Sequence, residues 1–338
     1  MTDLQYWITG NTAEGFVNFL DTNLLGIDRV IALKHPSAKL KSKILQNLIN
    51  KYRSDDLEIL QSALGSKYLD GLINREKSVA FLDEKIANSS TKTIDLEDLL
   101  PVSQQDQEDF QSLTQKAHES FTTGLKVHDD LEEVYINQMD FDRADEFANE
   151  FISDLLNDVP EKKRKSHTYH RFFGTNTADG VVNVVPHLTS NIKHVHYIKG
   201  RAGTGKSTIM KKIAQACSDH GFDVELYHCS FDPNSIDMVL VRELDFCIFD
   251  STDPHEFFPK RDGEVIEDLY GELVTPGTDE KFKTEINDLN NHYKSYMKQG
   301  IRYLKEADSY LEKTEQNYME NVTDQDIKKV TKHIVKNV

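Results

Sequence analysis

Short apolar runs separated by polar turn residues predict a series of β-strands in each half of the chain. In the N-terminal half they are IDRVIALK (27–34), LEILQS (57–62), REKSVAFLD (75–83) and TIDLEDLL (93–100). In the C-terminal half they are IKHVHYIK (192–199), VELYHC (224–229), RELDFCIFD (242–250) and EVIEDLYG (264–271). Runs of this length, bounded by turn residues, are typical of buried strands.

These two sets of strands belong to one sequence pattern that occurs twice in the chain. NTAEGFVN begins at Asn11, and NTADGVVN begins 165 residues later at Asn176. The same offset aligns HPSAKLKSKIL (35–45) with GRAGTGKSTIM (200–210). Because so many matches keep their order along the chain, the sequence predicts a tandem duplication.

Charged amphipathic segments at roughly 106–157 and 280–336 predict long helices that close each copy. Their apolar sides predict packing onto the domain of the same copy, and the alternative is that they recruit a protein partner. Strands that alternate with helices imply a parallel sheet with helices on its faces. A proline and a basic run in NDVPEKKRKSH (157–167) predict a boundary between two domains in this segment. We therefore expect domains at 1–157 and 168–338, joined by a linker at 158–167.

The composition of the chain limits the kinds of partner that it is expected to bind. The formal net charge of −17 arises from 57 acidic and 40 basic side chains, and such a surface repels nucleic-acid backbones. Three cysteines without a CxxC pair favour a reducing compartment. We find no secretory signal in MTDLQYWITGN and no apolar run near the roughly 20 residues of a membrane span. A cytoplasmic protein that binds neither nucleic acid nor membrane is expected.

The stretch HVHYIKGRAGTGKSTIMKKIA (194–214) matches the phosphate-binding pattern G-x-x-x-x-G-K-[S/T]. Glycines permit positive φ and close backbone approach, so that successive N–H groups point at phosphate oxygens. The expected helix at 206–220 directs its positive end at the same anion. The residues predicted to hold the nucleotide are Gly200, Arg201, Ala202, Gly203, Thr204, Gly205, Lys206, Ser207 and Thr208.

A magnesium site is predicted beside this loop. The apolar run LDFCIFDST (244–252) ends at Asp250, 44 residues after Lys206, which leaves room for one helix, one strand and a further crossover. Asp250 and the hydroxyl of Ser207 are the expected Mg²⁺ ligands, and Lys206 would reach the β- and γ-phosphates. Lys206 and Asp250 are therefore the leading catalytic candidates.

The group that activates the attacking water is not evident from the sequence. Many P-loop ATPases place a glutamate directly after this aspartate, but here Ser251 follows. Candidates are Asp253, His255 and Glu256 in STDPHEFFP and Asp232 in HCSFDPNSID. Positive charge near the phosphates could come from Arg201, Arg242 or Arg261. The counterpart of Arg242 is Arg75, so a structural role is favoured for that pair.

The first copy has lost the glycines of the loop. His35, Ala38 and Leu40 stand where the second copy has glycine, although Lys41, Ser42 and Asp83 persist. A residue with a Cβ disfavours left-handed conformations by about 1–2 kcal/mol. We therefore predict a degenerate, non-hydrolysing domain that packs against the active copy.

GRAGTGKST, HCSFDPNSIDM and FDSTDPHEFFP together resemble a family of bacterial tandem P-loop proteins described as ATP-binding, ATPase-like or nucleotide-kinase-like. The resemblance implies two α/β P-loop NTPase-like domains with helical appendages, and ATP with Mg²⁺ as the ligand. Slow ATP hydrolysis coupled to a rearrangement between the halves is the preferred function. A small-molecule or nucleotide kinase and a non-hydrolysing ATP sensor that recruits a protein remain as alternatives.

Overall fold

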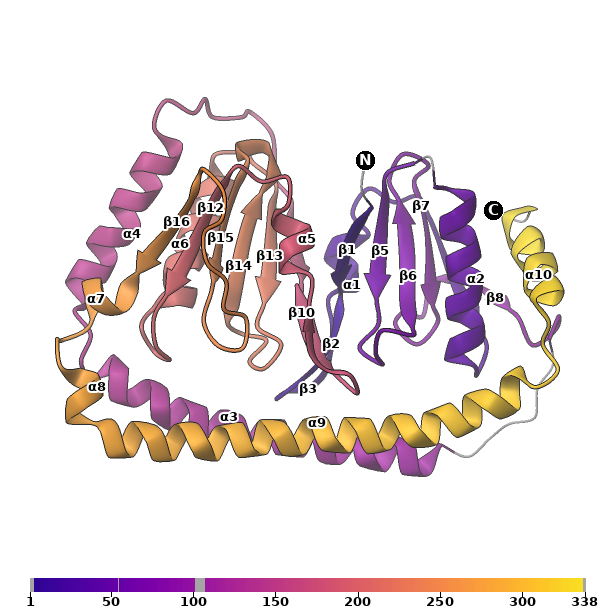
Figure 1. Ribbon diagram of the computed structural model, residues 1–338. Helices are drawn as coiled ribbons and strands as arrows, with labels where there is room; N and C mark the ends of the chain where they lie inside the picture. The colour runs from indigo at the N-terminus through magenta and orange to yellow at the C-terminus, as the bar shows by residue number, and fades with distance from the viewer. Residues whose placement is uncertain (1–2, 54, 101–106, 337–338) are drawn as a thin grey trace.

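Two six-stranded sheets stand side by side above a pair of long helices in the computed structural model (Figure 1). The structure describes residues 3–53, 55–100 and 107–336. The N-terminal sheet has the order β1-β5-β6-β7-β4-β8, with strands β1 (Leu4–Trp7), β4 (Arg29–Lys34), β5 (Leu57–Gln61), β6 (Leu69–Asn74), β7 (Val79–Asp83) and β8 (Lys92–Asp95). The C-terminal sheet has the order β9-β13-β14-β15-β12-β16, with β9 (Thr168–Arg171), β12 (His194–Lys199), β13 (Val224–His228), β14 (Ile236–Val241), β15 (Phe246–Asp250) and β16 (Glu264–Asp268).

The strands run in equivalent directions in the two sheets, so the sheets share one connectivity. Both are mainly parallel, which confirms the predicted α/β class. The exceptions are β6 and β14, which run antiparallel to both of their neighbours. The expected crossover before Asp250 is therefore wrong. A 3₁₀ turn at Arg242–Leu244, followed by Asp245 at a φ of 52°, reverses β14 directly into β15.

Two hairpins meet between the sheets, and they contain the repeated NTA(E/D)G motif. They are β2 (Thr9–Thr12) with β3 (Gly15–Asn18), and β10 (Gly174–Thr177) with β11 (Gly180–Asn183). The Asn11 amide donates to the carbonyl of Asn176 at 3.0 Å, and the Asn176 amide donates back to the carbonyl of Asn11 at 2.9 Å. The motif therefore forms a reciprocal contact between the halves in addition to its turn.

A buried arginine links the two sheets near the same place. The Arg171 guanidinium is 3.2 Å from Glu58 and 2.9 Å from Glu225, which belong to opposite halves. Arg75 pairs with Glu58, and Arg242 pairs with Glu225, which supports the structural role expected for these two arginines. Removing one member of such a cluster would leave a buried charge without its partner.

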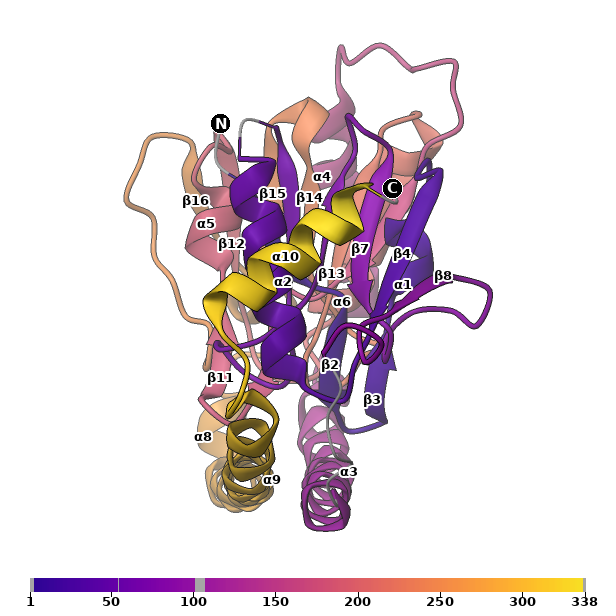
Figure 2. The ribbon, with the colours of Figure 1, turned by 90° about the vertical axis from the view of Figure 1, so that its right-hand side faces the viewer.

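The long helices α3 (Glu108–Ile136) and α9 (Lys283–Met319) run antiparallel below both sheets. Figure 2 shows the pair nearly end-on, side by side beneath the sheets. Gly124 and Gly300 allow close packing, since a Cβ at Gly124 would press on Tyr296 and one at Gly300 would collide with Phe121. Each helix spans both halves of the molecule.

The remaining helices cover the sheets, and two of them cover the sheet of the other half. The short helices are α1 (Leu20–Asn23), α5 (Val185–Thr189), α7 (Leu269–Leu273) and α8 (Thr278–Lys281), and the longer ones are α2 (Ala38–Lys51), α4 (Phe141–Leu156), α6 (Lys206–Asp219) and α10 (Asp324–Lys336). Helix α4 buries Ala144 and Ala148 in the core around α6, and α10 joins the core around α2 (Figure 1). The expectation that the appendages pack onto their own domains is therefore wrong, because α3 and α9 carry the chain across.

Candidate functional site

The glycine-rich loop joins β12 to α6 at the carboxyl end of the C-terminal sheet. Gly203 and Gly205 have φ angles of 71° and 78°, in the left-handed region that the missing Cβ makes accessible. The Thr204 hydroxyl and the Lys206 ammonium donate to the Arg201 carbonyl at 2.9 and 2.6 Å. Helix α6 begins at Lys206, so its positive end faces the space that the loop encloses.

Asp250 lies next to the loop because β15 pairs in parallel with β12, with Ile198 opposite Asp250. The Lys206 ammonium is 3.5 Å from the Asp250 carboxylate, and the Thr252 hydroxyl donates to that carboxylate at 2.7 Å. The Ser207 hydroxyl accepts the Ile236 N–H at 2.9 Å. The predicted residues Lys206, Ser207 and Asp250 therefore come together at one edge of the sheet.

A second carboxylate, that of Asp237, belongs to this group and was missed from the sequence. Met238 pairs with Phe249, which places Asp237 across from Asp250 on the neighbouring strand. Burial, followed by the Asp250 charge, raises the pKa of Asp237 to about 7. Two carboxylates that repel one another beside a hydroxyl are the hard oxygen donors that Mg²⁺ prefers, so Asp250, Asp237 and Ser207 fit a magnesium ion.

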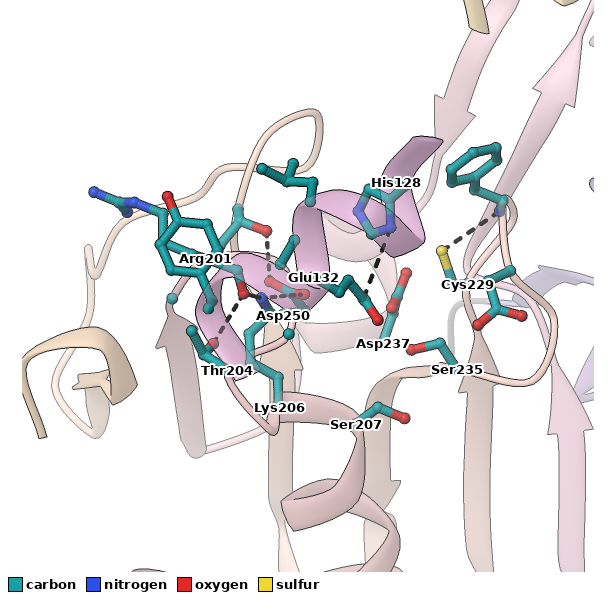
Figure 3. Close-up of a pocket in the computed structure, with 18 of the residues that line it drawn as sticks. His128, Glu132, Arg201, Thr204, Lys206, Ser207, Cys229, Ser235, Asp237 and Asp250 are labelled. Atoms are coloured by element: carbon teal, nitrogen blue, oxygen red, sulfur yellow. Dashed lines mark hydrogen bonds and ion pairs between the residues drawn. The ribbon is translucent and has the colours of Figure 1, made fainter. Parts of the chain in front are cut away.

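A cavity of about 1030 Å³ opens over the loop (Figure 3). Its walls come from the loop and α6, from the segments after β13 and β15, and from α3 and α9. All nine residues predicted to hold the nucleotide line it, together with Asp232, Asp237, Asp250, Asp253, His255 and Glu256. The volume is at the upper end of the range for small-molecule sites.

The family model described as an AAA domain matches residues 178–230, which contain the whole loop and all of α6. The chain contains a P-loop NTPase domain. No curated protein and no solved structure matches the chain. Among the described residues, no helix combines the length and apolarity that a membrane crossing requires.

Helix α3 brings three further side chains into the P-loop cavity. His128, Asp129 and Glu132 line it, and their ligand atoms lie within 4.8 Å of one another. The His128 ring nitrogen is 3.7 Å from the Glu132 carboxylate, and the backbone of Glu132 packs closely against Gly203. The only sequence signal was the amphipathic pattern of a helix about 70 residues before the loop, which cannot show where the helix docks.

Burial sets the ionisation of this cluster. Burial and the neighbouring Asp129 charge raise the pKa of Glu132, while Lys206 and the Gly203 N–H act against the rise. Burial lowers the pKa of His128 to about 4, and the Lys206 charge adds to that effect. His128 is therefore neutral near pH 7 and can hold a hydrogen bond without adding positive charge.

Two of the other predicted catalytic candidates are tied to basic residues. Asp253 is 2.8 Å from Lys294 on α9, and Glu256 is 3.1 Å from Lys199. His255 is largely buried, and its Nδ1 has no hydrogen-bond partner among the described residues. All three line the cavity, but none of them contacts the loop through a hydrogen bond or ion pair that the structure records.

Arg201 is the only one of the three predicted arginines that lines the cavity. It pairs with Asp279 at 2.9 Å and lies over the ring of Tyr270. Arg261 instead binds Glu264 and the Ser190 carbonyl. Arg201 is thus the arginine placed to meet phosphate charge.

The corresponding loop of the N-terminal half is filled by a side chain from α9. Glu315, on α9 and 1% exposed, accepts the Ala38 N–H at 2.7 Å, the Lys39 N–H at 3.2 Å and the Ser37 hydroxyl. Lys41 is fully buried and lies 2.7 Å from both Asp83 and Glu84. A carboxylate of the protein therefore stands where an anion would bind.

Proposed function

We propose that the protein is a Mg-ATP-binding P-loop NTPase that hydrolyses ATP slowly and couples hydrolysis to a rearrangement between an active and a degenerate half. One observation carries this proposal. The cavity over the loop is closed on its far side by α3, a helix that begins beneath the other half. A ligand in this cavity would touch both halves at once.

Binding of the triphosphate uses the loop as its anion site. The backbone N–H groups of 203–207 and the start of α6 would receive the phosphates, and Lys206 would turn from the Arg201 carbonyl to the terminal phosphates. Asp250, Asp237 and Ser207 would hold Mg²⁺, which supplies charge neutralisation to the phosphates. Arg201 stands at the rim and adds a further positive charge.

Coupling to the other half follows from the two long helices. Glu132 on α3 contacts the active loop, and Glu315 near the far end of α9 contacts the inactive one. Because α3 and α9 pack along their length, a displacement of α3 at the active loop would be felt along α9. Helices α4 and α10 each pack on the sheet of the other half. They would therefore transmit the same movement to the cores around α6 and α2.

A small-molecule kinase is the second candidate, and the extent of the cavity favours it. Beyond the loop, the cavity reaches Tyr293, Lys294 and Lys298 on α9. Tyr293 packs against Phe231 and His128, and this aromatic and basic wall could receive an acceptor. Such an acceptor would replace water as the nucleophile.

Phosphate release from Mg-ATP tests the proposal. The wild-type protein is expected to hydrolyse ATP slowly without an added acceptor, and Asp250→Asn is expected to lower the rate at least about 100-fold, since removing a group that stabilises phosphoryl charge has effects of this order. Asp83→Asn, the matched change in the degenerate half, should leave the rate unchanged in protein that remains folded. Turnover that requires an added metabolite would establish the kinase, and equal rates for wild type and Asp250→Asn would refute a reaction at this site.

A further inference from the structure

The position next to Asp250, where many P-loop ATPases carry a catalytic carboxylate, is occupied by Ser251 and cannot serve hydrolysis. The Ser251 side chain is buried, donates to the Phe257 carbonyl at 2.8 Å and accepts the Phe257 N–H at 2.8 Å. Both interactions hold the 251–257 turn together. Water attack on a phosphate is assisted by a group that accepts the water proton, so another carboxylate of the cavity must provide it.

Most of the carboxylates that line the cavity are engaged elsewhere. Asp253 and Glu256 are held by Lys294 and Lys199. Asp237 faces Asp250 on the adjacent strand and belongs with the magnesium ligands. A base must be near the loop and free of a lysine or arginine partner.

Glu132 meets both conditions. Of the other carboxylates that line the cavity, Asp145 is held by Lys212, Asp129 is exposed, and Asp232 accepts the Asn234 N–H within its own turn. The side-chain contact that the structure records for the Glu132 carboxylate is with neutral His128 at 3.7 Å. The backbone of Glu132 packs so closely on the loop that a Cβ at Gly203 would collide with its carbonyl oxygen. The carboxylate is therefore fixed over the loop, within electrostatic reach of Lys206, and Figure 3 shows it between Asp250 and Asp237.

We propose that Glu132, carried on α3 from the N-terminal half, is the general base of ATP hydrolysis at the C-terminal P-loop. The oxygen of a water molecule bonds to the γ-phosphorus while the bond from that phosphorus to the β–γ bridging oxygen breaks. The water proton passes to the Glu132 carboxylate, and ADP leaves with the electron pair of the broken bond. The proton then returns to solvent or to the released phosphate.

Two features of the structure suit Glu132 to this role. The raised pKa of its carboxyl makes the carboxylate a better proton acceptor than a solvated one. His128, one helical turn earlier, lies 3.7 Å from the carboxylate and, being neutral, does not compete for it as a charged partner. The assignment rests on the proposed ATPase function and adds that the active half borrows its base from the degenerate one.

The test separates binding from hydrolysis. Glu132→Gln keeps the shape of the side chain but removes its ability to accept a proton, so single-turnover hydrolysis should fall about 100- to 10,000-fold. Its affinity for Mg-ATPγS should stay within about 3-fold of wild type, which also shows that the variant is folded. Glu132→Asp, which keeps the carboxylate but withdraws it, should retain an intermediate rate.

Glu133→Gln is the matched control, because Glu133 is the next residue on α3, is exposed and does not line the P-loop cavity. It should hydrolyse ATP at the wild-type rate. Hydrolysis by Glu132→Gln within about 3-fold of wild type would overturn the assignment, and so would a loss of nucleotide affinity that accounts for the whole loss of rate. If the wild type binds Mg-ATP and never releases phosphate, the proposed ATPase function itself fails, and that result is visible before any variant is made.

Discussion

The two loops at 35–42 and 200–207 follow equivalent strands in equivalent sheets, yet one is closed and the other opens into a cavity. Helix α6 begins at Lys206, whereas α2 begins at Ala38, three residues before Lys41. Ala38 and Leu40 replace the two glycines with positive φ, and both are part of the helix. Loss of glycine thus lets the loop wind into a first helical turn, which removes the anion-binding concavity.

Charge is balanced differently in the two loops. The N–H groups at the start of α2 are satisfied by Glu315, and Lys41 is neutralised by Asp83 and Glu84. In the active half the Lys206 ammonium has a backbone carbonyl and a carboxylate at 3.5 Å. The persistent Lys41-Ser42 pair therefore has a structural role, with Lys41 as the centre of a buried ionic cluster and Ser42 accepting the Leu69 N–H.

The largest expected effect comes from replacing the equivalent lysines, Lys206 and Lys41, one at a time. Lys206→Ala should weaken Mg-ATPγS binding at least about 100-fold, or about 2.7 kcal/mol, because it removes the ammonium that faces the phosphates. Lys41→Met should leave the affinity within about 2-fold, because the Lys41 charge is already used inside the N-terminal half. Equilibrium binding to both variants checks this, and a loss of affinity in Lys41→Met would erase the distinction between the loops.

A substitution of Glu315 should destabilise the closed loop without affecting the open one. Glu315→Ala leaves the buried Ala38 N–H unsatisfied, at about 1–3 kcal/mol, and each kcal/mol lowers Tm by about 2–4 °C in a domain of this size. Glu312→Ala is the control, since Glu312 forms an exposed ion pair with Lys67, a class of contact worth about 0–1 kcal/mol. Thermal unfolding of both variants tests this prediction. Equal Tm values would mean that the Glu315 carboxylate contributes nothing to the stability of the protein.

A smaller effect is expected from pH, and it concerns aspartates that both halves retain. Burial raises the pKa of Asp70 and of Asp237 to about 7 each. The folded protein holds these protons up to about pH 7, whereas an unfolded chain releases them near pH 4, so the stability that these two groups contribute should fall as pH rises through that interval. Between pH 5.5 and pH 8 the Tm of the wild type should fall by a few degrees relative to that of Asp237→Asn, since the histidines whose pKa is lowered, such as His128, affect both proteins alike.

The effect of Mg²⁺ on Tm should distinguish Asp237 from its counterpart Asp70. Mg²⁺ favours ionised Asp237 beside Asp250, so Mg²⁺ added at pH 8 should raise the Tm of the wild type and have less effect on Asp237→Asn. Asp70 lies where Lys41 has already paired with Asp83, so Asp70→Asn should leave the response to Mg²⁺ unchanged. An equal Mg²⁺ response in all three proteins would remove Asp237 from the metal site.

Local patterns were sufficient to predict four strands of each sheet, the loop and the position of Asp250, because each depends on residues close together in the sequence. Strand β14 was missed because IDMVLV adjoins the turn at Arg242–Leu244 and was not separated from the following run. Asp237 was missed with it. Glu132 and Glu315 could not be found, because helix periodicity says which face is apolar but not which loop the face meets. The exchange of α4 and α10 escaped prediction for the same reason.

The number of nucleotides bound per chain tests the central claim most directly. Calorimetric titration of the wild-type protein with Mg-ATPγS should give one site per chain, because the loop at 200–207 lines a large cavity while Glu315 fills the other loop. Two sites of similar affinity would contradict the account, since the loop without glycines would then bind a phosphate that its own carboxylate is proposed to replace.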